Sequence, residues 1–121
     1  MDTLVKTVAP EETNSPSPTS CPLTAALTAV GGKWSMISLY LLSSEKRRFN
    51  ELRRLMPEIS HKVLTETLRG LEQEGLILRT VYAEVPPKVE YSITPYGETL
   101  RPLMKAVIAW GNAHIERKHR E

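Results

Sequence analysis

Four segments between residues 48 and 94 decide the fold: RFNEL (48–52), ISHKVL (59–64), LRGLEQEGLI (68–77) and PPKVEYSIT (86–94). The first three carry apolar residues three to four positions apart, which predicts two short helices. The last alternates between apolar and polar residues, as a strand does. Two helices joined by a tight turn and followed by a β-hairpin can place one helix in a groove of DNA with a loop beside it.

Single residues set the boundaries of the two central helices. Pro57 ends the first helix, which carries Phe49, Leu52, Leu55 and Met56. Ser60 is a suitable N-cap for the second helix, and Gly75 ends it. The side that we expect to be buried is lined by Val63, Leu64, Thr67, Leu68 and Leu71. The opposite side carries His61, Lys62, Thr65, Glu66 and Arg69.

Two helices are expected before this region. Pro22 suits a first helical turn, and apolar residues recur at helical spacing until Gly31-Gly32 interrupts them. Residues 33–43 predict a second helix that is apolar nearly all round. A helix of this kind lies at the centre of a domain.

A hairpin and a last helix are expected after the two central helices. Residues 77–83 and 88–93 predict two strands, joined by residues 84–87. Thr94 caps a helix that extends to Ile115, with an apolar surface broader than one small domain needs. The fold class predicted is therefore mainly α with a small β-hairpin, a winged helix-turn-helix.

Length and composition fit one globular domain. The chain has 121 residues, of which 40% are hydrophobic and 25% charged, enough to bury a core without metal. We expect a flexible N-terminal tail at 1–20, rich in Pro, Ser and Thr, then a domain at 21–118 and a short C-terminal end at 119–121.

The sequence also bears on the cellular location of the protein. The single Cys21 excludes an internal disulfide, and no signal segment precedes it, so an intracellular location is expected. The longest nearly uncharged stretch, 34–44, is too short to span a membrane, so we expect no membrane association. The net charge of +2 points only weakly to an anionic partner.

Basic residues are concentrated around the two central helices. Residues 46–54 carry five basic side chains and one acidic one, a local net charge of +4 that suits DNA phosphates. In the second central helix we expect His61, Lys62 and Thr65 to reach bases and Ser60 and Arg69 to lie nearer the backbone. The residues predicted to contact DNA are Arg48, Asn50, Arg53, Arg54, Ser60, His61, Lys62, Thr65, Arg69 and Lys88. A solvated charged face would give the same pattern.

The hairpin loop is less typical of a base reader. It offers Arg79 and Lys88, but Glu84 lies near its tip and Pro86-Pro87 stiffens it. This composition favours contacts with the DNA backbone, and a purely structural hairpin fits equally well.

Cys21 precedes the first expected helix, where free N–H groups and the helix dipole favour a thiolate. A reactive sensor cysteine and a small packing residue are both compatible with this position. No metal centre or cofactor is expected, because three His and one Cys form no ligand pattern. The absence of nucleophile elbows, phosphate loops and dinucleotide fingerprints argues against an enzyme.

An ordered set of motifs resembles the HxlR-type winged-helix transcriptional regulators, in the neighbourhood of the MarR-like proteins. The resemblance covers roughly residues 20–113. It rests on Cys21-Pro22-Leu23, Gly31-Gly32-Lys33-Trp34-Ser35, the segments quoted above and Gly75-Leu76-Ile77. One departure is His61, where the family commonly carries a longer amide or basic side chain, which leaves the operator sequence open.

The resemblance implies a homodimeric, cytoplasmic DNA-binding regulator that associates with the nucleoid when it binds DNA. Its first and last helices would form the dimer contact, through Leu23, Leu27, Leu103, Val107 and Trp110. Cys21 matches a cysteine that several members use to sense oxidants or electrophiles. The expected partner is promoter DNA with a pseudo-palindromic operator, bound by a repressor. The alternative is a protein-interaction module that keeps the fold without reading DNA sequence.

Overall fold

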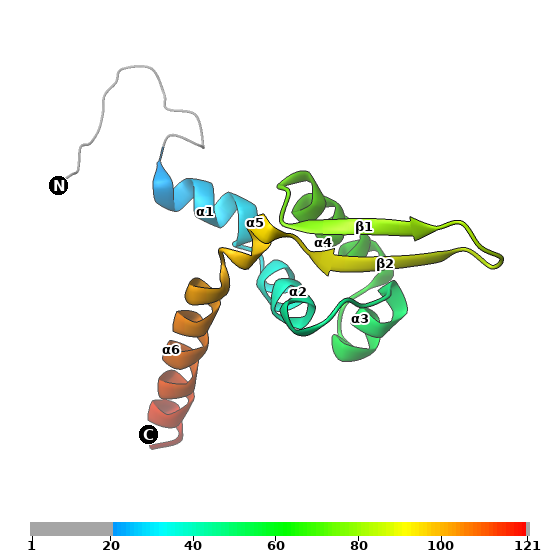
Figure 1. Cartoon of the computed structure of the whole chain (residues 1–121). Coiled ribbons are helices and arrows are strands. Elements are labelled where there is room, and N and C mark those ends of the chain that lie inside the picture. The colour runs from blue at the N-terminus through cyan, green and yellow to red at the C-terminus, as the bar shows by residue number, and fades with distance from the viewer. Residues whose placement is uncertain (1–20, 121) are drawn as a thin grey trace. The chain divides into compact units, whose positions relative to one another are not determined.

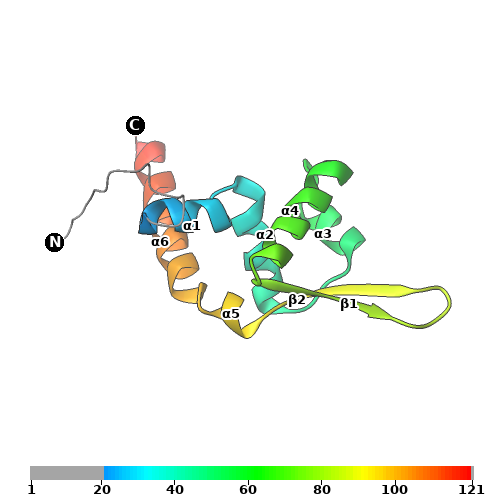
Figure 2. The ribbon, with the colours of Figure 1, turned by 90° about the horizontal axis from the view of Figure 1, so that it is seen from above.

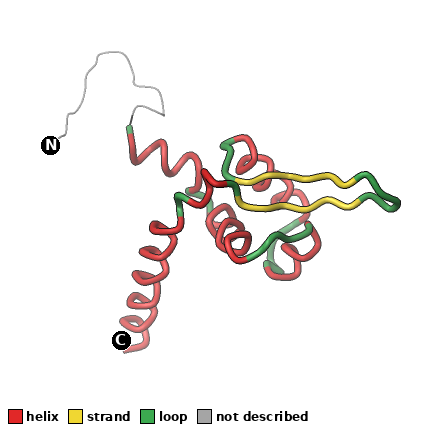
Figure 3. Tube along the Cα trace, viewed as in Figure 1, coloured by secondary structure: helices red, strands yellow, loops and turns green. Residues whose placement is uncertain are grey.

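The computed structural model describes residues 21–120, and the predicted tail at 1–20 lies outside this range (Figure 1). The chain divides after Gly32 into two compact units. Helices dominate, and two strands form the only sheet of the described residues (Figure 3). The predicted fold class, mainly α with a β-hairpin, is confirmed.

The described part of the first unit is one helix, α1 (Pro22–Val30). Pro22 occupies its first turn, and Cys21 precedes it in an extended conformation. The N–H of Gly31 donates to the Leu27 oxygen at 2.7 Å, which closes the last turn. The side chains of Leu23 and Leu27 are exposed.

Three helices enclose the core of the second unit: α2 (Lys33–Ser44), α3 (Phe49–Leu55) and α4 (His61–Gln73) (Figure 2). The fully buried side chains are Leu39, Leu42, Leu52, Leu64, Leu68, Leu71 and Ser38. The hydroxyl of Ser38 lies 3.8 Å from the Met56 sulfur, which gives this buried polar group a weak partner. Ser38, Leu39 and Leu42 place α2 in the core, as expected for a central helix, although its Tyr40 is half exposed.

The ends of α4 follow the predicted signals. The Ser60 hydroxyl oxygen accepts a hydrogen bond from the Val63 N–H at 3.1 Å, as an N-cap does. After the helix, Gly75 adopts a φ of +78°, a conformation that glycine tolerates and other residues rarely adopt. The expected burial of Val63 is wrong, since this residue lies toward the exposed side of α4.

The hairpin consists of β1 (Ile77–Tyr82) and β2 (Lys88–Ile93), which pair antiparallel with Ile77 opposite Ile93 and Tyr82 opposite Lys88. Arg47 forms an isolated antiparallel bridge with Tyr91 of β2. Its N–H and C=O bond to the C=O and N–H of Tyr91 at 3.0 and 2.8 Å. This bridge ties the segment before α3 to the sheet.

The C-terminal part differs from the single helix that we expected. A short α5 (Pro95–Glu98) is followed by a break at residues 99–100 and by a long α6 (Arg101–Arg120). Pro102 explains the break, because proline has no N–H for the Glu98 carbonyl and its ring excludes a continuous helix there. The predicted cap is confirmed, since the Thr94 hydroxyl oxygen accepts from the Gly97 N–H at 2.9 Å.

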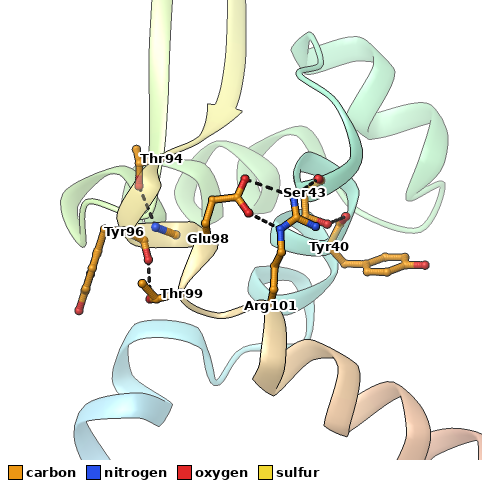
Figure 4. A network of polar contacts seen from close by, with 8 residues as sticks. Tyr40, Ser43, Thr94, Tyr96, Glu98, Thr99 and Arg101 are labelled. Carbon is orange, nitrogen blue, oxygen red and sulfur yellow. Dashed lines mark hydrogen bonds and ion pairs between the residues drawn. The ribbon is translucent and has the colours of Figure 1, made fainter.

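Arg101 spans this break (Figure 4). Its guanidinium pairs with the Glu98 carboxylate of α5 and donates to the Ser43 oxygen of α2 at 2.6 Å. Met104 is the buried residue of α6, and most of the later side chains are exposed. Arg101 and the buried Met104 thus both attach the start of α6 to the core.

Candidate nucleic-acid interface

Helices α3 and α4 form the helix-turn-helix. The N–H of Arg48 donates to the Glu51 carboxylate at 2.7 Å, which fixes the start of α3. At the start of α4 the His61 ring lies against the Phe49 ring, with centroids 4.7 Å apart. The two helices therefore contact each other at their N-terminal ends, and His61 is exposed while its ring is supported.

Five cationic side chains of this region have no protein partner. Among residues 21–120, no hydrogen bond or ion pair involves the side chains of Arg53 and Arg54 on α3, Lys62 and Arg69 on α4, or Arg79 on β1. All five residues are exposed. Their charges are available to an external anion, and repeated anions on one partner would suit several of them at once.

An open groove of about 560 Å³ separates α4 from the hairpin. It is lined by Phe49, His61, Thr65, Leu68, Arg69, Glu72, Arg79, Val89 and Tyr91. Arg79 lies opposite Tyr91 in the hairpin register and shares its face of the sheet. Arg79 is not among the residues that the sequence predicts to contact DNA. The two-residue alternation Ile77, Arg79, Val81 is the signal that places it on this face.

Other predicted contacts gather on α3. A smaller hollow of about 340 Å³ is lined by Asn50, Arg53, Arg54, Pro57 and Ile59. Asn50 therefore shares a surface with the two unpartnered arginines of the same helix. This surface brings an amide that can donate and accept hydrogen bonds beside two fixed positive charges.

Two predicted hydroxyl contacts are already used within α4. Thr65 donates to the His61 oxygen at 2.9 Å, and the Ser60 oxygen serves as the N-cap acceptor. The Ser60 hydroxyl hydrogen can still be donated to a phosphate, because a hydroxyl donates and accepts at the same time. Thr65 is half-buried at the edge of the groove.

Two of the five basic side chains at 46–54 are paired within the protein, so fewer of them are available to DNA than the local charge of +4 suggests. Arg47 is partly buried, donates to the Leu41 oxygen at 3.0 Å and pairs with Glu45 at 3.3 Å. Lys46 lies 3.6 Å from the Glu90 carboxylate. Lys88 on the hairpin, a predicted DNA contact, lies 3.6 Å from the same carboxylate and 4.9 Å from the centre of the Tyr82 ring.

Cys21 is a free, exposed thiol at the start of α1. The Thr24 hydroxyl, and after it the Thr24 N–H, favours the thiolate and lowers the pKa of Cys21 below its ordinary value of 9.0. Sγ nevertheless completes no capping hydrogen bond of good geometry. The thiol is therefore accessible and is stabilised as a thiolate by dipoles rather than by a neighbouring charge.

Helix α6 exposes large apolar side chains along its length: Leu103, Val107, Ile108, Trp110 and Ile115. Trp110 is 68% exposed and stacks on His114 with the ring centroids 4.8 Å apart. In α1, Leu23 is likewise 68% exposed. A row of apolar residues on a helix is a common sign of a protein interface.

Neither a metal site nor a single membrane-spanning helix is found among residues 21–120. This range contains no group of three His, Cys, Asp or Glu side chains that could hold a metal ion. No single helix there is long and apolar enough to cross a membrane, and only α1 and α2 taken as a broken pair reach that length and composition.

Comparison with known proteins identifies the family. The HxlR-like helix-turn-helix family matches residues 29–119. YdeP of Bacillus subtilis (strain 168), an uncharacterized HTH-type transcriptional regulator, is 48% identical over 97 residues, which are 80% of this chain and 76% of YdeP.

Solved structures agree with this match. The redox regulator HypR in its reduced form has a TM-score of 0.78 and 42% identity, with 84% of this chain and 100% of that one covered. Reduced YodB, a transcriptional regulator from B. subtilis, has a TM-score of 0.68 and 33% identity, with 76% and 91% covered. These proteins are regulators rather than enzymes. The chain belongs to the HxlR-like helix-turn-helix family and is a transcriptional regulator of the helix-turn-helix type.

Proposed function

We propose that this regulator represses transcription by binding a pseudo-palindromic operator as a homodimer. The observation that carries the proposal is the set of five unpartnered cations on α3, α4 and β1. Arg53, Arg54 and Lys62 would lie against phosphates or base edges, with α4 in the major groove. Arg69 and Arg79, on the two sides of the groove, would hold the DNA backbone.

The remaining predicted contacts have graded roles in this proposal. His61 and Thr65 would face bases from the first turns of α4, while Arg48, Asn50 and Ser60 would contact the backbone. Lys88 would contribute less than its charge suggests, because Glu90 lies beside it. Binding DNA in this way implies a cytoplasmic protein that associates with the nucleoid.

The homodimer part of the proposal rests on exposed apolar residues. Leu103, Val107 and Trp110 on α6, and Leu23 and Leu27 on α1, are exposed large apolar side chains. A second copy could bury them through a symmetric contact. Two α4 helices would then enter successive major grooves about 34–36 Å apart.

The proposed contacts predict how DNA affinity should respond when positive charges are removed. In fluorescence anisotropy with promoter DNA, the triple variant Arg53→Ala, Arg54→Ala, Lys62→Ala should lose at least about 100-fold in affinity at 0.1 M salt, because each phosphate contact releases about one counterion. Arg120→Ala is a single-charge control away from the proposed contacts, since Arg120 is an exposed arginine paired with Glu116 on α6. Equal binding of wild type to promoter and random DNA at physiological salt would refute operator binding and leave the alternative of a winged-helix protein-interaction module.

We further propose that Cys21 makes the regulator responsive to oxidants or electrophiles. Support comes from its exposure, from its lowered pKa and from the similarity to HypR, a redox regulator. Two Cys21 thiols from two subunits could form a disulfide while diamide takes up two electrons and two protons. A quinone would instead form one C–S bond and take up the thiol proton.

Variants at Cys21 test this second part. Wild type and Cys21→Ser are compared for promoter binding before and after treatment with diamide, and again with a quinone. Affinity should change on treatment in the wild type alone. An identical response of both proteins would rule out Cys21 as the sensor.

A further inference from the structure

One acidic side chain on the hairpin lies between two lysines and a tyrosine. Glu90 accepts a hydrogen bond from the Tyr82 hydroxyl at 2.9 Å. Its two carboxylate oxygens lie 3.6 Å from the ammonium groups of Lys46 and Lys88. The Glu90 side chain is only 14% exposed, whereas that of Lys46 is 62% exposed. Glu90 is therefore held in place by protein contacts, while Lys46 reaches into solvent.

The two lysines belong to segments that flank the proposed DNA contacts. Lys46 precedes α3, which carries Asn50, Arg53 and Arg54, and Lys88 follows the loop at the tip of the hairpin. Lys88 also lies over the Tyr82 ring, so the same tyrosine contacts both the lysine and the carboxylate. The hairpin thus places a fixed negative charge beside two cations, on the face of the sheet opposite to the face that lines the groove.

The distances indicate what Glu90 does to the lysines. At 3.6 Å an N–O pair is beyond hydrogen-bonding range, so Glu90 attracts the ammonium groups without fixing their direction. The hydrogen bond from Tyr82, with help from the two lysines, lowers the pKa of Glu90 and keeps it ionised at neutral pH. One carboxylate then offsets one of two positive charges.

We infer that Glu90 is an internal counter-ion that limits sequence-independent DNA binding. A lysine that is already neutralised releases fewer counterions when it meets a phosphate, so it contributes less to non-specific affinity. Low non-specific affinity matters to a regulator, because the genome offers a large excess of competing sites. The inference rests on the proposed function, since it assumes that the protein binds DNA.

The test measures affinity for random-sequence duplex DNA as a function of salt concentration. Glu90→Gln keeps the shape of the side chain and an acceptor for Tyr82 while it removes the charge. It should bind random DNA about 8-fold more tightly at 0.1 M salt, with a log–log salt slope steeper by about 0.9. Glu84→Gln is the matched control: it removes the same charge from an exposed residue of the same hairpin, and the gain should stay below about 2-fold.

A double-mutant cycle then connects the effect to the lysines. In a Lys46→Ala, Lys88→Ala background, Glu90→Gln should no longer tighten binding by more than about 2-fold. Circular dichroism and the melting temperature establish that each variant is folded.

The unfavourable outcomes are distinct. Weaker binding by Glu90→Gln would mean that Glu90 orients the lysines, and equal gains for Glu90→Gln and Glu84→Gln would reduce the effect to net charge. A gain that persists without the lysines would also overturn the inference. Each of these leaves the proposed function intact. If the wild type shows no salt-dependent DNA binding at all, the proposed function fails and this inference fails with it.

Discussion

The guanidinium of Arg101 donates a hydrogen bond to the main-chain oxygen of Ser43 at 2.6 Å. The same side chain pairs with Glu98, so it connects the end of α2 with the break between α5 and α6 (Figure 4). The last four carbonyls of a helix lack partners within that helix. Arg101 supplies one to α2 and thereby ties the start of α6 to the end of α2.

Removing this side chain should lower stability. We expect Arg101→Ala to reduce the melting temperature by a few degrees, because it breaks contacts to both Ser43 and Glu98. Arg101→Lys should recover part of the loss, since lysine keeps the charge but lacks the planar fork of donors. Arg120→Ala is the control and should shift the melting temperature by less than about 1 °C, as exposed ion pairs contribute little. A loss no larger than that of the control would show that the contact is not stabilising.

This effect should also depend on pH. The hydrogen bond from Arg101 lowers the pKa of Glu98 below its ordinary value of 4.5. A carboxylate with a depressed pKa in the folded state stabilises the fold above the unfolded pKa, and the contribution is lost as the pH falls through the folded pKa. The difference in melting temperature between wild type and Arg101→Ala should therefore be full at neutral pH and shrink below about pH 4.5. A constant difference down to pH 2 would contradict the ion-pair explanation.

Two glycines should respond to alanine in opposite directions. A Cβ on Gly97 would lie 2.2 Å from the Leu76 oxygen and 2.6 Å from Ile93 Cγ1, whereas a Cβ on Gly70 in α4 would meet nothing within 4 Å. Gly97→Ala should cost about 1–3 kcal/mol of unfolding free energy through overpacking. Gly70→Ala should add about 0.5–1 kcal/mol, because it restricts the unfolded chain. Urea unfolding at one fixed protein concentration measures both, and a loss for both variants would contradict the prediction.

Local signals allowed most of the fold to be predicted from sequence. Ser60, Gly75 and Thr94 act within a few residues of themselves, so their caps and the turn at Gly75 were predictable. The break before α6 was missed although Pro102 is visible in the sequence, because the apolar pattern continues through it.

The site was predicted less completely, since its details depend on residues far apart in the chain. Arg47 is a structural residue because it pairs with Tyr91, a partner that no local pattern indicates. The restraint on Lys46 by Glu90 arises from that same pairing, which brings the two segments together. The position of Arg79 in the candidate site follows from the hairpin register, which places it opposite Tyr91 on the face that lines the groove with α4.

The proposed dimer contact can be tested on α6. Trp110→Glu introduces a charge on the exposed apolar face, and we expect it to raise the dimer dissociation constant by about 30-fold or more, as at other interface hot spots. Asn112→Glu makes the same change in charge on the opposite side of the helix and should leave association unchanged. Light scattering after size exclusion decides, since a dimer has twice the 13.6 kDa mass of the chain. Monomeric wild type at micromolar concentration, or equal effects of both variants, would refute the contact.

The reactivity of Cys21 should depend on Thr24. The Thr24 hydroxyl is the largest contribution to the lowered pKa of the thiol, so the midpoint of the alkylation rate against pH should lie below 9.0 in the wild type. Thr24→Val removes this hydroxyl and should move the midpoint upward, because less thiolate is present at a given pH. Thr28→Val makes the same change in the next turn of α1, where no contact with Cys21 is lost, and should leave the midpoint unchanged. If Thr24→Val and Thr28→Val give the same profile as the wild type, the hydroxyl does not stabilise the thiolate, and any sensitivity of Cys21 to oxidants must come from its exposure alone.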